Sequence, residues 1–237
     1  MNLADILFPK SCLGCGRSGG YICENCLSKV RTPKPVCPEC LKPSIDGMTH
    51  TKCLRPLGLD GLISLWNYEG VVRKAILALK YKYAEEIAQE LSQYAVEALE
   101  TRNSFCLIPA SPAGRYTSIS LVPIPLYWLR KNWRGFNQAE EIGKTISGGV
   151  GWKHEPNLLI RKKLKVPQTS LKRRERLSNV QGIFAVSLNI DISQYPNIVL
   201  FDDVWTTGST LKEVAKVLKR AGVKKVWGVT LARGFSW

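Results

Sequence analysis

The chain has 237 residues, 45% of them apolar, and it carries 34 lysines and arginines against 19 aspartates and glutamates. This composition supports one sizeable domain, or a domain with a small module, and argues against a disordered chain. No run approaches the ~20 apolar residues that cross a bilayer. The N-terminus lacks a basic stretch followed by a long apolar one. We therefore expect no membrane span, no secretory signal and a cytoplasmic protein.

The net charge of +15 is concentrated in the last third of the chain. Residues 161–237 carry 15 basic side chains and 5 acidic ones, whereas residues 58–160 carry 11 and 10. Such asymmetry favours a polyanionic partner, either nucleic acid or a phosphorylated small molecule. A basic surface with no dedicated partner is the plainer alternative.

Seven of the eight cysteines lie before residue 54, and they fall into pairs separated by two residues. In the fourth pair a histidine takes the place of the first cysteine. C-x2-C spacing suits zinc, because a tight turn brings two thiolates to one tetrahedral ion. Cytosolic cysteines seldom form structural disulfides. The predicted zinc ligands are Cys12, Cys15, Cys23, Cys26, Cys37, Cys40, His50 and Cys53.

The spacing leaves the pairing open. Sequential pairing assigns the first four ligands to one zinc and the last four to another, but a cross-braced arrangement or a single zinc also fits. Eight ligands for two ions leave no open coordination position, so we predict structural rather than catalytic zinc. The metal would help to fold a module at residues 1–57, followed by a second domain at 58–237. Cys106 stands apart and is expected in a core.

Strands and helices alternate after a linker at 55–61. Apolar and β-branched runs predict strands at 62–68, 120–128, 158–163, 183–188, 197–201 and 225–232. Helical spacing predicts one or two helices within 71–100, one from near Asn137 to the glycines of 148–151, and one over 209–221 with Gly222 as its stop. This order predicts a largely parallel α/β sheet covered by helices on both faces.

The stretch NIVLFDDVWTTGST, residues 197–210, places two carboxylates after an apolar strand and a hydroxyl-rich turn before a helix. Ligands of such sheets bind beyond the carboxyl ends of strands, and a helix N-terminus suits phosphate. Adjacent carboxylates accept hydrogen bonds from two vicinal hydroxyls. The stretch therefore predicts a sugar-phosphate site, and an ordinary surface turn with a helix cap is the alternative.

A P-loop nucleotide site is rejected. An apolar strand ending in two aspartates also occurs there, and Gly143-Lys144-Thr145 resembles the end of its phosphate loop. However, position 138 is glutamine where that loop needs glycine, and the three residues fall inside a predicted helix.

VLFDDVWTTGST resembles the phosphoribosyl-diphosphate motif of type I phosphoribosyltransferases. VPIPLYWLRKNWRGFNQA, with its RGFNQ, and QTSLKRRERLSNVQGIF are similar to the ComF family, which includes the ComFC proteins associated with DNA uptake in competent bacteria. That family also carries an N-terminal module of paired cysteines. The resemblance covers nearly the whole chain, and RGFNQ with the cysteine module makes it specific.

The resemblance implies a type I phosphoribosyltransferase-like, mainly parallel sheet flanked by helices, with a small zinc-ribbon-like module. The implied ligand is phosphoribosyl diphosphate with Mg²⁺, and the implied reaction displaces pyrophosphate at the anomeric carbon; the acceptor has no sequence signature. Trp205 departs from the superfamily pattern, which usually has a small or aliphatic residue there. The implied roles are ribose binding by Asp202 and Asp203, phosphate binding by Thr206, Thr207, Gly208, Ser209 and Thr210, a pyrophosphate loop with Arg134, Gly135, Asn137 and Gln138, and a mobile basic loop with Gln168, Lys172, Arg173, Arg174 and Arg176.

A second hypothesis is a non-catalytic protein on the same fold that binds single-stranded DNA or proteins of the DNA-uptake machinery. Residues 161–176 hold eight basic side chains and one acidic one, which fits a phosphate backbone. Trp128, Trp133 and Phe136 lie near basic residues and offer rings on which bases stack. The alternative for the basic run is a solvated loop, or one that only neutralises pyrophosphate.

Overall fold

A parallel sheet forms the centre of the protein. The computed structural model describes residues 10–79, 84–101, 119–126, 137–162 and 182–234. The strand order is β1-β7-β6-β2-β3, and all four pairings are parallel, so the carboxyl ends of the strands share one edge. The strands are β1 (Gly61–Asn67), β2 (Ile119–Pro123), β3 (Lys153–His154), β6 (Asn197–Trp205) and β7 (Lys225–Arg233).

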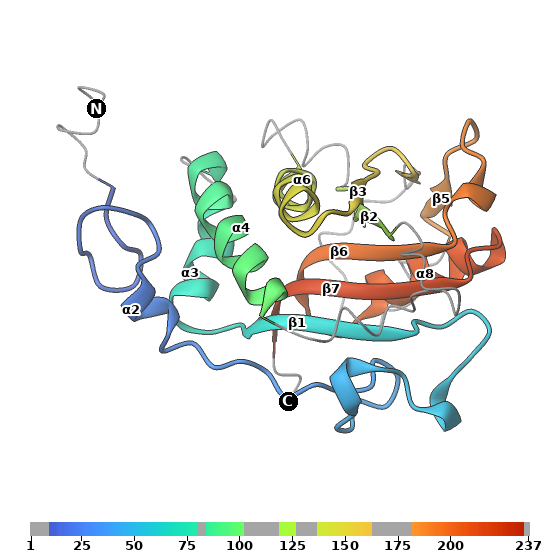
Figure 1. Cartoon of the computed structure of the whole chain (residues 1–237), viewed down its shortest axis with the longest axis horizontal. Coiled ribbons are helices and arrows are strands. Elements are labelled where there is room, and N and C mark those ends of the chain that lie inside the picture. Colours follow the sequence, from blue (N-terminus) through green and yellow to red (C-terminus); the bar gives the residue numbers. More distant parts are fainter. Residues whose placement is uncertain (1–9, 80–83, 102–118, 127–136, 163–181, 235–237) are drawn as a thin grey trace, which may run out of the picture.

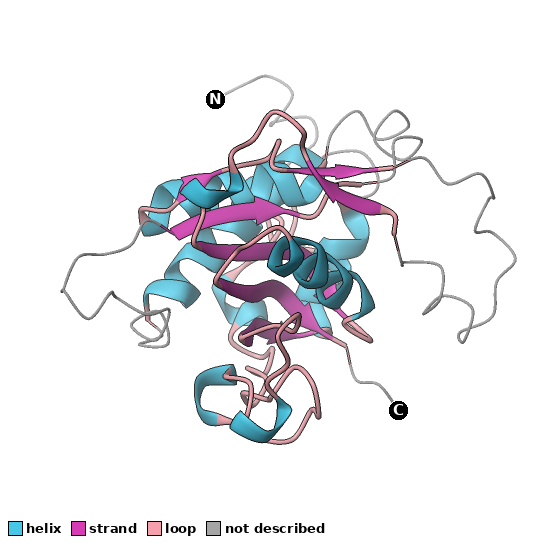
Figure 2. Ribbon diagram, turned by 90° about the vertical axis from the view of Figure 1, so that its right-hand side faces the viewer, coloured by secondary structure: helices cyan, strands magenta, loops and turns pink. Residues whose placement is uncertain are grey.

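Helices cover both faces of this sheet, as the alternation of elements predicted (Figures 1 and 2). One face packs on α3 (Gly70–Ala78), α4 (Ala84–Glu100) and α6 (Gln138–Val150); the other packs on α8 (Ser209–Arg220). Strand residues alternate between the two layers, because successive side chains point to opposite faces. In β6, Val199 and Phe201 join the first layer, whereas Ile198 and Leu200 join the second.

Most predicted elements are confirmed, with different bounds. The region 71–100 forms two helices, and the strand expected at 120–128 ends at Pro123. The glycines of 148–151 do not all end α6. Gly149 lies inside the helix against Val96 of α4, and Gly151 alone forms the left-handed C-cap at φ 72°.

Two predicted strands lie outside the main sheet. β4 (Leu159–Arg161) and β5 (Phe184–Val186) pair antiparallel with each other as a separate two-stranded sheet. Their buried residues pack in the same layer as α8. β3 was not predicted, and neither was the short 3-10 helix η4 (Ile192–Gln194).

The N-terminal segment runs along the free edge of β1 (Figure 1). It contains the short helices α2 (Glu24–Leu27), η1 (Ile45–Gly47) and η2 (Thr51–Cys53). The N–H of Asn67 donates to Arg31 O at 2.9 Å at one end of the strand, and the N–H of Thr49 donates to Asp60 O at 2.9 Å at the other. These bonds satisfy part of an edge that would otherwise invite pairing with another chain.

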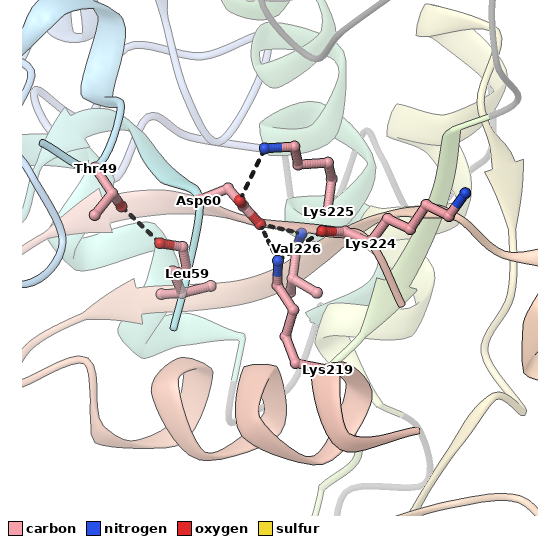
Figure 3. Close-up of polar contacts among 7 residues, drawn as sticks. All are labelled: Thr49, Leu59, Asp60, Lys219, Lys224, Lys225 and Val226. Atoms are coloured by element: carbon pink, nitrogen blue, oxygen red, sulfur yellow. Dashed lines mark hydrogen bonds and ion pairs between the residues drawn. The ribbon is translucent and has the colours of Figure 1, made fainter. Parts of the chain in front are cut away.

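Asp60 joins the second half of this segment to the sheet (Figure 3). Its carboxylate accepts from the N–H of Val226 at 2.8 Å and pairs with Lys219 at 2.7 Å and Lys225 at 3.3 Å. Leu59 precedes Asp60 in the chain, and its carbonyl oxygen accepts a hydrogen bond from the hydroxyl of Thr49 at 2.6 Å. The segment is therefore fastened to the main domain, and the domain boundary at 57/58 stays a prediction.

None of the described helices combines the length and the apolar character that crossing a membrane requires.

Candidate functional site

Two groups of four metal-ligating side chains form in the N-terminal segment. In each group the ligand atoms all lie within 4.8 Å of one another. Each group combines two pairs that are consecutive in the sequence. This is the sequential pairing, and it excludes the cross-braced arrangement that the spacing had left open. The first group consists of Cys12, Cys15, Cys23 and Cys26, and the second of Cys37, Cys40, His50 and Cys53.

The chemistry of these clusters fits zinc. In the first cluster burial raises the pKa of the Cys12 thiol, but backbone N–H donors, those of Cys15 and Cys23 foremost, outweigh it and lower that pKa to about 6. Burial and the neighbouring thiols raise the pKa of Cys26 to about 12. Packed thiols of this kind ionise together only when a cation offsets their charge. Four S and N donors per group, with no open position, define structural sites.

The paired aspartates lie inside β6 and not beyond it, which corrects the expected strand end at Phe201. The strand continues to Trp205 because Asp202, Val204 and Trp205 pair with β7, Asp202 opposite Thr230. The carboxylates bond to the chain itself: Asp202 Oδ1 accepts from the N–H of Asp203 at 2.9 Å, and Asp203 Oδ1 accepts from the N–H of Val204 at 2.7 Å. The pair thus stands at the carboxyl end of the central strand.

The two carboxyl groups share one environment. Burial, followed by the charge of Asp203, raises the pKa of Asp202 well above its usual value, and Arg161 partly offsets this. Asp202 as a residue is half-buried. Two acceptors in contact are stabilised by ligands that bring hydroxyl donors or a cation.

The turn at 206–208 connects β6 to the N-terminus of α8. Gly208 adopts φ 71°, and a side chain there would overlap the indole of Trp205. The indole is 2% exposed and packs in the core beneath the turn. Trp205 therefore supports the turn from inside, which explains the bulky residue at this position.

The turn presents hydroxyl groups to solvent. Thr206 and Thr207 are exposed, and the Thr207 hydroxyl donates to Ser209 Oγ at 3.1 Å. The N-cap, Gly208, has no side chain to cap α8, and the N–H of Ser209 in the first turn donates to Thr207 Oγ1 at 3.4 Å. A small pocket opens at this point and is lined by Asp202, Val204, Trp205, Thr206, Gly208, Ser209, Thr210 and Leu211.

Asn137 and Gln138, from the predicted pyrophosphate loop, are buried and hold structural contacts. Asn137 Oδ1 caps α6 by accepting from the N–H of Ala139 at 3.2 Å. The Gln138 amide donates to Leu79 O at the end of α3 at 2.9 Å. These contacts fix the base of the loop, and the pyrophosphate role stays a prediction. Arg134, Gly135, Gln168, Lys172, Arg173, Arg174 and Arg176 lie outside the described residues, as does Cys106.

Sequence reasoning missed two residues near the aspartates. Arg161 ends β4, and its charge lowers the pKa of Asp202. Tyr68 follows β1, and the charge of Asp203 contributes to its raised pKa after the larger effect of burial. The position of Tyr68 at the end of the strand predicted at 62–68 was a usable signal. Arg161 belongs to the basic run 161–176, but nothing in the local sequence connects it with Asp202.

The fold and the two ligand clusters together define the class: a phosphoribosyltransferase-like α/β protein that carries a zinc-ribbon-like module at its N-terminus. The family model of the double zinc ribbon domain matches residues 3–54. DNA utilization protein YhgH of Escherichia coli K12 is 30% identical over 213 residues, which cover 86% of this chain and 87% of that protein.

Two further relatives agree. Competence protein F of Haemophilus influenzae is 34% identical over 115 residues, which cover 48% of this chain and 50% of that protein. Competence protein ComFC of Streptococcus pneumoniae is 29% identical over 216 residues, which cover 90% of this chain and 87% of that protein. The chain belongs to the ComF family, as the sequence motifs predicted.

Proposed function

We propose that the protein binds phosphoribosyl diphosphate with Mg²⁺ at the carboxyl edge of its sheet, and that it transfers or hydrolyses the sugar at its anomeric carbon. The observation that carries this proposal is that Asp202 lines one small pocket before α8 together with Thr206 and Gly208 of the turn, and that Asp203 is its neighbour in β6. The diol of a ribose supplies donors to the two carboxylates, and its 5-phosphate fits the N–H groups and hydroxyls of the turn.

The chemistry follows from charge. Departure of pyrophosphate leaves an oxocarbenium-like centre, so positioning and neutralisation of the leaving group lower the barrier. Mg²⁺ bound to the ribose hydroxyls and the pyrophosphate would supply part of that neutralisation and needs few protein ligands. Arg161 adds a cation near Asp202. The roles of residues 134–138 and 168–176 in holding the pyrophosphate remain part of the proposal.

The names of the relatives support a cellular role. Proteins named for DNA utilization and for competence match most of the chain, so we propose that this protein acts in DNA uptake or use, in the cytoplasm. A second candidate, binding of single-stranded DNA or of an uptake protein without catalysis, is favoured by the net charge of +15. If the protein does not bind single-stranded DNA, or binds it with an affinity that does not fall as the salt concentration rises, the nucleic-acid form of this candidate is wrong.

Titration calorimetry tests the main proposal. We expect the zinc-loaded protein to bind phosphoribosyl diphosphate in MgCl2, and Asp202→Asn and Asp203→Asn to lose at least about tenfold in affinity. Asp191→Asn is the matched control, because Asp191 is an exposed carboxylate that accepts hydrogen bonds from Ser193 and Gln194 of its own turn. Absence of binding by the parent protein would overturn the proposal. Pyrophosphate release with candidate acceptors then separates transfer from binding alone.

A further inference from the structure

Arg31 lies in the linker between the two zinc clusters, and its side chain binds the carboxylate of Glu69 in the main domain. Its Nε and Nη2 donate to the two Glu69 carboxylate oxygens at 3.0 and 2.9 Å, and its backbone N–H donates to the same group at 3.2 Å. A guanidinium that binds a carboxylate through two parallel bonds fixes orientation as well as distance. Arg31 O also accepts from the N–H of Asn67 at 2.9 Å, so four hydrogen bonds join the linker to residues 67–69.

The segment that Arg31 holds is the turn from β1 into α3. Gly70 adopts φ 54° there, and a Cβ at this position would lie 3.1 Å from Val30 Cγ2 of the linker. The linker and the turn therefore pack closely as well as sharing hydrogen bonds. This turn lies at the carboxyl edge of the sheet, where the aspartate pair stands.

Backbone bonds continue from this turn across the edge. The N–H of Tyr68 donates to Arg233 O at 2.9 Å, and the N–H of Gly234 donates to Trp205 O at 2.9 Å. Trp205 is the residue that supports the turn at 206–208. A row of hydrogen bonds thus connects the zinc module with the strand end that carries the candidate phosphate turn.

Tyr68 stands on the same turn, and its side chain is half-buried. Burial raises the pKa of the Tyr68 hydroxyl, and the charge of Asp203 adds to this rise. The Arg73 guanidinium lies 5.9 Å from the centre of the Tyr68 ring. The turn therefore ends at the same edge of the sheet as the strand that carries Asp203.

We infer that Arg31 is a positioning residue for the carboxyl-edge site: by binding Glu69 it holds the 67–70 turn, which backbone hydrogen bonds connect to the strand end at Trp205, so the zinc module takes part in ligand binding. The inference rests on the proposed function of that site. A site held in place before the ligand arrives loses less entropy on binding, so a loosened turn weakens binding without removing any ligand contact.

The test compares three variants of the full zinc-loaded chain. We expect Arg31→Ala to weaken binding of phosphoribosyl diphosphate with MgCl2 about three- to fivefold, the range of one exposed ion pair, with zinc content unchanged. Arg31→Lys restores part of the loss, because it keeps a charge without the fork. Lys29→Ala removes the same charge from an exposed position two residues away and should leave affinity within about twofold.

A second control separates positioning from general stability. Glu90 fastens the first zinc cluster to α4 by accepting from the N–H groups of Tyr21 and Ile22 at 2.8 and 3.0 Å, away from the carboxyl edge. Glu90→Ala should lower the melting temperature and spare affinity. If it weakens binding as much as Arg31→Ala does, or if Arg31→Ala binds as the parent does, the inference is wrong.

Hydrogen exchange gives a readout that needs no ligand. In Arg31→Ala we expect faster exchange of the amides of residues 67–70 and of Gly234, with the amides of Tyr21 and Ile22 unchanged. Unchanged exchange at 67–70 would overturn the inference. A parent protein that does not bind phosphoribosyl diphosphate would overturn the proposed function, and the exchange data would still decide whether Arg31 holds the turn.

Discussion

The indole of Trp205 occupies the space that any side chain at position 208 would need. Gly208 is constrained a second time by its positive φ of 71°, which favours glycine over every other residue. Backbone conformation and packing therefore demand the same residue at the centre of the candidate phosphate turn.

Gly208→Ala tests this double constraint. We expect it to lower the free energy of unfolding by at least about 2 kcal/mol, since the αL conformation costs an alanine roughly 1–2 kcal/mol and the overlap with Trp205 adds to it. Ligand affinity should fall with it. Gly222→Ala is the control: φ is 107°, but nothing lies within 4 Å of a Cβ there. Equal losses in urea unfolding for both variants would show that the Trp205 contact contributes nothing.

Asp202→Asn should change how stability depends on pH. Because burial and Asp203 raise the pKa of Asp202 in the folded state, the folded protein keeps a proton that the unfolded chain has lost. Stability therefore falls as pH rises through this interval. We expect the melting temperature of the ligand-free parent to decline relative to Asp202→Asn as the pH rises above 3.8, the ordinary pKa of an aspartate. If the melting temperatures of the parent and of Asp202→Asn change in parallel with pH, the raised pKa of Asp202 is contradicted. The melting temperature of Asp191→Asn should change with pH as that of the parent does.

Each zinc cluster should lose its metal separately. Cys15 and Cys40 are the exposed ligands of the first and second clusters. We expect metal analysis to find two zinc ions in the parent and one in Cys15→Ser and in Cys40→Ser, because three remaining donors bind zinc far more weakly. Cys106→Ser should keep both ions. Loss of both ions from a single substitution would show that the clusters fold as one unit.

Asp60→Ala should destabilise the attachment of the second cluster. Asp60 and Lys219 are 10% and 11% exposed as side chains, and removal of one member of a buried pair leaves an uncompensated charge. We expect a loss of about 3 kcal/mol in the free energy of unfolding. Lys225, whose side chain is 45% exposed, is the comparison: Lys225→Met should cost below about 1 kcal/mol. Similar losses for the two variants would contradict the buried character of the Lys219 pair.

The sequence by itself determined the zinc ligands, the parallel sheet and the acidic pair, because these depend on local spacing and on hydrophobic period. The Cys-x2-Cys spacing predicted the zinc ligands, and the apolar run 197–201 predicted a strand. The predicted end of the strand at Phe201 was wrong. A charged residue such as Asp202 is typical of a strand end, but its pairing with Thr230 of β7 continues the strand. Neighbouring strands far away in sequence decide such ends.

Only the tertiary structure decided which ligands share a zinc site, what Trp205 does, and which residues stand beside the aspartates. The charge of Arg161, at the end of β4, lowers the pKa of Asp202 in β6, and Arg31 reaches Glu69 across 38 positions of sequence. Contacts of this kind carry no local pattern. They form because burial of apolar faces brings separate segments together, and the polar groups at the margins then pair with whatever the packing has placed there.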